Sequence, residues 1–189
     1  MKKMAEYYDI KGSEENVALV TDIFTQGDSR YYDSYEINLV ANFLDKEAII
    51  IEKSKILEYP CTDKEISRME PPQAYYKLQA KKRLESDGYK ILGFELLLNG
   101  GRVDVLAKNE EKGEIVAVEC CSCRVSKAID YLEEDNVVLW IVSLSETGLE
   151  SELPFFIVRR GVNWLKTIRS HKESIRKSLE KIKSPADRL

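Results

Sequence analysis

The chain has 189 residues, 43% of them hydrophobic and 33% charged, which is enough for one well-packed domain and excludes wholesale disorder. The longest apolar run is far shorter than the roughly 20 residues of a membrane-spanning helix, and no apolar stretch follows the first residues, so we expect a cytoplasmic protein with no membrane partner. The formal net charge is −4, yet residues 159–189 carry 10 Lys+Arg against 3 Asp+Glu. This basic segment is either a phosphate-binding surface or a solvated helix face.

Residues 1–70 are expected to form an α+β extension. The β-branched and apolar run at 16–24 predicts a strand, and residues 27–30 predict a turn. Ser34 is expected to cap a helix that runs to about Leu44. The short run 48–51 fits either a buried strand or the core of a helix. Thr62 and Glu65 fit a capping box that opens a short helix.

Pro71 and Pro72 mark the expected boundary of a core that runs from 71 to 160, because neither residue continues a helix. Helices are predicted at 73–87 and 126–134, and strands at 89–98, 102–108, 114–121, 137–142 and 155–158. Gly88 fits the left-handed position that ends a helix, and the Asn99-Gly100 turn predicts a hairpin. A basic helix from about Asn163 occupies the last segment, 161–189.

This order of elements predicts an α/β fold. Three strands meander, and a helix then crosses over to a strand that should lie parallel to its neighbour. The sequence therefore indicates a mixed β-sheet core flanked by helices.

Two carboxylates occupy positions where the strand patterns call for apolar residues. Asp104 interrupts the strand 102–108, and Glu119 interrupts the strand 114–121. A buried carboxylate without a partner costs several kcal/mol, so two of them on adjacent antiparallel strands suggest a shared cation. Oxygen ligands of this kind suit Mg²⁺ or Mn²⁺. The alternative is that each carboxylate pairs with a nearby base, such as Arg102 or Lys108.

The order helix, hairpin, Asp in the second strand and Glu in the third resembles the PD-(D/E)XK nucleases, the restriction-endonuclease-like superfamily. The resemblance rests on Gly88-Tyr89, on the run from Gly101 to Ala107 and on the run from Val116 to Glu119. It covers Tyr75 to Val142 and is nearest to archaeal Holliday-junction resolvases and related archaeal and viral nucleases.

The resemblance implies that Asp104, Glu119 and the carbonyl of Cys120 bind the metal, and that the metal activates water against a phosphodiester. Cys121 stands where the family usually has a catalytic lysine. A lysine from elsewhere could replace it: Lys108, Lys127, Lys77 and Lys81 are the candidates. The other two interpretations are a catalytically silent relative, and a metal or redox role for the thiols themselves.

The cysteine cluster at 120, 121 and 123 also has a simpler interpretation, as small buried hydrophobes. The single histidine, His171, lies near the edge of the apolar stripe of the last helix, and we expect it to pack or to face solvent rather than to catalyse.

We expect a divalent-metal-dependent nuclease that acts on DNA, including structured or branched DNA, and works as a homodimer. The alternative is a silent nuclease-fold protein that binds nucleic acid or a protein partner. Phosphate contacts are expected from basic residues of the first core helix and of the last helix: Lys77, Lys81, Lys82, Arg169, Lys172 and Arg176.

Overall fold

The computed structural model describes residues 10–26, 30, 32–69, 73–143 and 152–183. The first part of the chain contributes α2 (Glu14–Thr25), α3 (Ser34–Asp45), β1 (Ile49–Leu57) and α4 (Asp63–Ile66). Then follow α5 (Ala74–Ser86), β2 (Lys90–Leu98), β3 (Gly101–Asn109), β4 (Glu114–Cys120), α6 (Val125–Glu133) and β5 (Val137–Val142). The described chain ends with β6 (Glu152–Arg160) and α7 (Trp164–Lys183).

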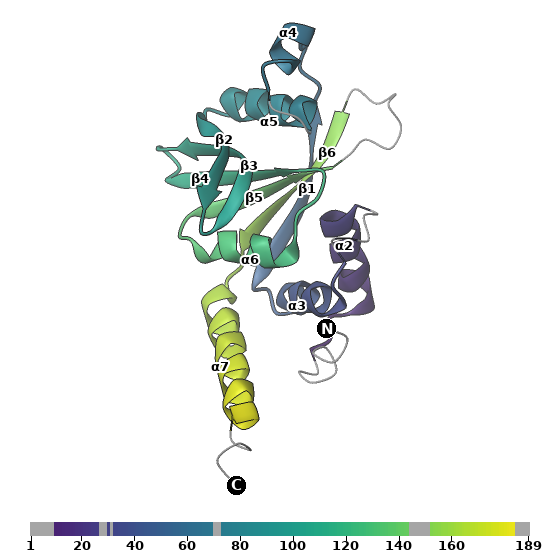
Figure 1. The fold of residues 1–189 in the computed structure, drawn as a ribbon, viewed down its shortest axis with the longest axis vertical. Helices are drawn as coiled ribbons and strands as arrows, with labels where there is room; N and C mark the ends of the chain where they lie inside the picture. Colours follow the sequence, from purple (N-terminus) through teal and green to yellow (C-terminus); the bar gives the residue numbers. More distant parts are fainter. Residues whose placement is uncertain (1–9, 27–29, 31, 70–72, 144–151, 184–189) are drawn as a thin grey trace.

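One six-stranded sheet organises the molecule, with the strand order β1-β6-β5-β4-β3-β2 (Figure 1). The strands β2, β3 and β4 form an antiparallel meander, and β5 pairs in parallel with β4 after the α6 crossover. The strand β1 pairs with β6 at the far edge, so residues of the N-terminal extension belong to the same sheet as the core. The predicted α/β architecture, a mixed sheet flanked by helices, is confirmed.

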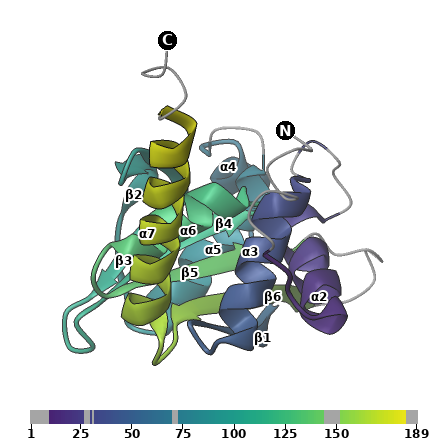
Figure 2. The same ribbon diagram turned by 90° about the horizontal axis from the view of Figure 1, so that it is seen from below.

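Helices cover both faces of this sheet. The helices α2, α3, α6 and α7 lie on one face, and α4 and α5 lie on the other (Figures 1 and 2). Two apolar clusters correspond to these faces: one joins α6 residues such as Tyr131 to Leu106 and Ala117, and the other joins Leu84 of α5 to Val105. The central strand β5 is buried along its whole length, as its continuous apolar run predicts.

The structure differs from the sequence prediction at residues 16–24, which are helical rather than extended. Ser13 caps this helix by accepting a hydrogen bond from the backbone N–H of Asn16. Val20, Ile23 and Phe24 are buried together, at a spacing that a helix brings to one face. The helical period and the cap outweigh the β-branched composition of the segment.

The remaining element predictions agree with the structure to within a few residues. Asp33, not Ser34, caps α3, and the open alternative at 48–51 is resolved as the strand β1. The capping box of Thr62 and Glu65 is present, and Gly88 has a φ of 81°. Residues 27–29 of the turn predicted at 27–30, and the boundary at Pro71 and Pro72, lie outside the described residues.

Candidate functional site

The strands β3 and β4 bring the two predicted carboxylates together. Val105 pairs with Val118, and the same register continued by one residue sets Asp104 opposite Glu119. The backbone N–H of Cys120 donates to Oδ2 of Asp104 at 2.7 Å, which fixes the Asp104 side chain against the end of β4. The antiparallel pairing expected from the sequence therefore places both acids at one end of this strand pair.

Asp104 is compensated by a buried lysine of α5. The Nζ atom of Lys77 lies 3.3 Å from Oδ1 of Asp104, and the lysine side chain is only 4% exposed. Lys77 also forms an ion pair with Glu95 of β2. Burial raises the pKa of Asp104, while the Cys120 N–H and Lys77 act to lower it. Burial lowers the pKa of Lys77, but the two carboxylates outweigh burial and raise it, so this lysine remains charged.

Glu119 has a different set of partners, all from α6. Its Oε2 lies 2.7 Å from Nζ of Lys127, and its Oε1 accepts a hydrogen bond from the Tyr131 hydroxyl at 3.2 Å. Burial raises the pKa of Glu119 to about 7, against the lowering effect of Lys127. Electrostatic repulsion from Asp104 also acts to raise the pKa of Glu119.

Each acid is thus neutralised by its own lysine, and the two lysines come from helices on opposite faces of the sheet (Figure 1). The alternative, in which each carboxylate pairs with a basic side chain, holds in this structure. The basic residues are Lys77 and Lys127, and not Arg102 and Lys108. Within the described part of the chain, no three His, Cys, Asp or Glu side chains gather where they could hold a metal ion.

The donor types nevertheless fit a hard divalent cation. Magnesium in proteins is commonly held by one or two carboxylates, with waters and substrate phosphates completing its shell. Asp104 and Glu119 supply those carboxylates from adjacent strands. Lys77 and Lys127 supply the positive charge that the acids require when no ion is bound.

The cysteines are packing residues in this structure. Cys120, Cys121 and Cys123 are all buried, at 8% exposure or less. Burial raises the pKa of Cys121 to about 11 and the pKa of the other two well above the usual value, so all three remain neutral thiols near pH 7. Thiolate chemistry at this cluster is therefore disfavoured.

Cys121 stands at the position where the nuclease resemblance would place a lysine. It has a φ of 78°, and its backbone N–H donates to the carbonyl of Val142 at 2.7 Å. The positive charge of Lys77 acts to lower the pKa of the Cys121 thiol. The ammonium of Lys77, which lies 3.3 Å from Asp104, therefore also acts electrostatically on position 121.

The other basic residues predicted for the site are distributed over the surface. Lys108 lies four residues along β3 from Asp104, and its Nζ is 3.5 Å from Glu110, so the structure does not bring it to the acids. Most of the basic residues predicted to contact phosphate form ion pairs with carboxylates of this chain. The pairs are Lys81 with Glu85, Lys82 with Glu65, Lys172 with Glu133, and Arg176 with Glu173 and Glu180. Arg169 is exposed on α7, whereas Lys77 is buried and does not face solvent.

The sequence analysis missed two residues of the candidate site, Glu95 and Tyr131. Glu95 lies in the apolar strand β2 with a φ of 53°, and it is joined to Asp104 through Lys77. The same signal that singled out Asp104, an acid inside an apolar strand, was available for Glu95. Tyr131, which binds Glu119, had no comparable signal because tyrosine is common in apolar helix faces.

Glu119 opens onto a surface pocket of about 440 Å³ between the β2–β3 hairpin and α6. Arg102, Arg124 and Lys127 line this pocket together with Glu119 and Asp130. The side-chain amide of Asn99 donates to the carbonyl of Asp130 at 2.7 Å, which ties the hairpin tip to α6.

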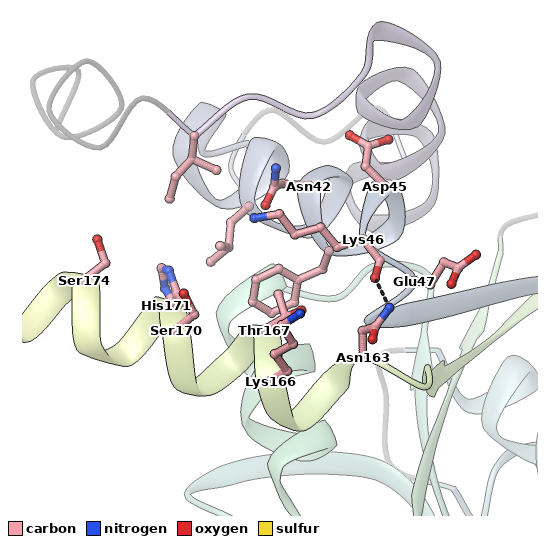
Figure 3. Close-up of a pocket in the computed structure, with 13 residues that line it drawn as sticks. Asn42, Asp45, Lys46, Glu47, Asn163, Lys166, Thr167, Ser170, His171 and Ser174 are labelled. Carbon is pink, nitrogen blue, oxygen red and sulfur yellow. Dashed lines mark hydrogen bonds between the residues drawn. The ribbon is translucent and has the colours of Figure 1, made fainter.

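A larger cavity, of about 620 Å³, lies between α3 and α7, and none of the site residues predicted from the sequence lines it (Figure 3). His171 and Thr167 of α7 face α3 there, and Asn163 donates to the carbonyl of Lys46 at 2.9 Å. The His171 ring packs edge-on against Phe43. The expected packing role of His171 therefore agrees with the structure.

No family model, curated protein or solved structure matches the chain. A functional proposal for this protein therefore rests on the structure of the site. Among the described residues, no helix has both the length and the apolar character needed to cross a membrane.

Proposed function

We propose that the protein is a divalent-metal-dependent nuclease of the restriction-endonuclease-like type, acting on DNA. The observation that carries the proposal is the meeting of Asp104 and Glu119 on adjacent strands with a buried lysine, Lys77, beside Asp104. The order α5-β2-β3-β4-α6-β5, with α5 and α6 on opposite faces, agrees with the arrangement that the resemblance implies.

In this proposal Asp104 and Glu119 hold Mg²⁺ or Mn²⁺, with the carbonyl of Cys120 as a third donor. The ion, when bound, polarises the scissile phosphate and lowers the pKa of the attacking water. Lys77 supplies the positive charge that position 121 lacks, because its ammonium lies beside Asp104 and remains charged. In that position it can orient the water and neutralise charge that develops on the phosphate.

Lys127 and Tyr131 have a positioning role in the proposal. Together they hold the Glu119 carboxylate at the pocket between the hairpin and α6. Lys127 would be available to a substrate phosphate if Glu119 held a divalent ion in its place. Metal and substrate binding are then favoured together, because each supplies charge that the other requires.

The test is cleavage of plasmid DNA and of a synthetic four-way junction in Mg²⁺ or Mn²⁺. The variants Asp104→Asn and Glu119→Gln keep the size of each side chain and remove its charge. Glu111→Gln is the matched control, because Glu111 is exposed on the turn between the same two strands. We expect metal-dependent cleavage by the wild type and the control, and a loss of at least about a hundredfold in both site variants.

A second readout separates metal binding from turnover. Electron paramagnetic resonance of Mn²⁺ should show binding to the wild type and weaker binding to Asp104→Asn. Absence of cleavage in both metals, by a protein that binds the same DNA, would overturn the catalytic proposal and favour a silent nuclease-fold binding protein. Cleavage that persists in both site variants would exclude these carboxylates as the active site.

A further inference from the structure

The surface beside Glu119 carries two exposed arginines, Arg102 and Arg124. Arg102 is 70% exposed, and its Nε atom is 3.9 Å from Glu95, at the limit of an ion pair. Arg124 is exposed at the start of α6. Burial raises the pKa of the nearby Glu36 carboxyl, and the charge of Arg124 acts to lower it. Both arginines line the pocket of about 440 Å³ that contains Glu119.

The charges of this pocket favour an anion. Glu119 and Lys127 neutralise each other at 2.7 Å, so the remaining charged groups are Arg102, Arg124 and Asp130. An excess of positive charge therefore remains on a chain whose formal net charge is −4. Arginine presents a planar group of five N–H donors, which suits the oxygens of a phosphodiester.

The fold holds in place the backbone segments that carry the two arginines. Arg102 is the Cα partner of Leu97 in the β2–β3 hairpin, directly after the tight turn at Asn99 and Gly100. The hydrogen bond from Asn99 to the Asp130 carbonyl holds this hairpin against α6. The side of the pocket that carries Arg102 and the side that carries Arg124 are therefore held in position relative to Glu119.

By contrast, most of the basic residues on α7 are paired within their own neighbourhood. Arg176 binds Glu173 and Glu180 of the same helix, and Lys172 binds Glu133. A phosphate would have to replace these carboxylates, whereas at Arg102 it would compete only with the long contact of 3.9 Å to Glu95.

We propose that Arg102 and Arg124 bind backbone phosphates of one nucleic-acid strand and guide that strand past Glu119. The proposal rests on the function proposed above, because it names the residues that position the substrate at the same carboxylates. It places the strand between the β2–β3 hairpin and the start of α6, and not along α7.

The test is binding of fluorescein-labelled single-stranded and duplex DNA in EDTA, where no cleavage occurs, followed by fluorescence anisotropy over a range of salt concentrations. The double variant Arg102→Gln, Arg124→Gln is compared with the matched double variant Arg169→Gln, Lys172→Gln on α7. Both remove two exposed cations, and circular dichroism checks that both are folded.

We expect the Arg102 and Arg124 variant to bind about tenfold or more weakly at low salt, with the slope of log affinity against log salt reduced by about 2. The α7 variant should change by less than about twofold. Restoration of most of the affinity by Arg102→Lys, Arg124→Lys would assign the effect to charge. Unchanged affinity in the glutamine variant, an equal loss in the α7 variant, or no DNA binding by the wild type would each overturn the inference.

Cleavage measured in parallel distinguishes this inference from the function on which it rests. If the wild type cleaves and the Arg102 and Arg124 variant binds and cleaves as well as it does, the nuclease proposal stands and the inference fails. If the wild type does not cleave in either metal but its DNA affinity depends on the two arginines, the binding surface stands and the catalytic proposal fails.

Discussion

Substitution of Lys77 by methionine tests the central ion pair most directly. Methionine keeps the length of the lysine stem but removes the ammonium, so Asp104 and Glu95 lose their shared cation. Removing one partner of a buried ion pair costs about 3–5 kcal/mol. The Asp104 side chain is 16% exposed and retains its hydrogen bond from Cys120, so we expect the lower end, about 3 kcal/mol.

The measurement is urea unfolding followed by circular dichroism at pH 7. For a chain of this size a loss of about 3 kcal/mol corresponds to a fall in Tm of roughly 6–12 °C. Lys81→Met is the control, because Lys81 lies one turn along the same helix and pairs with Glu85 at the surface. Its loss should be within about 0.5 kcal/mol.

A double-mutant cycle then identifies the cause. If Lys77 stabilises the fold by compensating Asp104, the variant that combines Lys77→Met with Asp104→Asn should be more stable than the sum of the two single effects requires. The reasoning is refuted if Lys77→Met is as stable as Lys81→Met, or if the two substitutions at Lys77 and Asp104 are simply additive.

Two further predictions concern protons and thiols. Burial, together with Lys46 and Lys172, lowers the pKa of His171 below 6.5, so folding resists its protonation and stability should fall as the pH drops below that value. His171→Asn should lose less stability than the wild type between pH 7 and 5.5 in urea melts; equal losses would contradict a depressed pKa. In the native protein a thiol reagent should modify Cys61 first, since it alone of the four cysteines is not buried, and the other three only on unfolding; rapid modification of all four would contradict their burial.

Most of the region from 73 to 142 could be predicted from the sequence because its signals are local. The Asn99-Gly100 turn specifies a hairpin, and Gly88 meets the positive φ that ends α5. The apolar run of β5 needs no partner to be recognised, since a strand buried on both faces has no polar side. Each signal depends on residues a few positions apart.

The wrong strand prediction at residues 16–24 also came from relying on local sequence signals. Val17, Val20 and Ile23 have high strand propensity, and propensity alone favoured a strand. The helix forms because Ser13 caps it and because its apolar face packs on α3, which is a tertiary contact. Strand propensity largely reports packing, so it is readily overridden when another packing is available.

At the candidate site the sequence identified the two acids but not the lysines that pair with them. Asp104 and Glu119 were found because an acid in an apolar strand is conspicuous. Their lysines were not assignable, because Lys77 precedes Asp104 by a helix and a strand, and Lys127 follows Glu119 by a turn into α6. Several lysines were open candidates, and only the packing of α5 and α6 on opposite faces of the sheet decides among them.

The two ion pairs bear on position 121, where this chain has a cysteine and the nuclease resemblance would place a lysine. A buried carboxylate requires a cation or a proton, and the electrostatic energy depends on distance, not on which element carries the charge. Lys77 meets that requirement for Asp104 at 3.3 Å from a helix on one face, and Lys127 meets it for Glu119 at 2.7 Å from a helix on the other. The candidate site therefore contains positive charge although position 121 is a cysteine. In the proposed nuclease Lys77 would have to remain beside the phosphate while Asp104 and Glu119 hold the ion, and the paired assays of Mn²⁺ binding and DNA cleavage test this requirement.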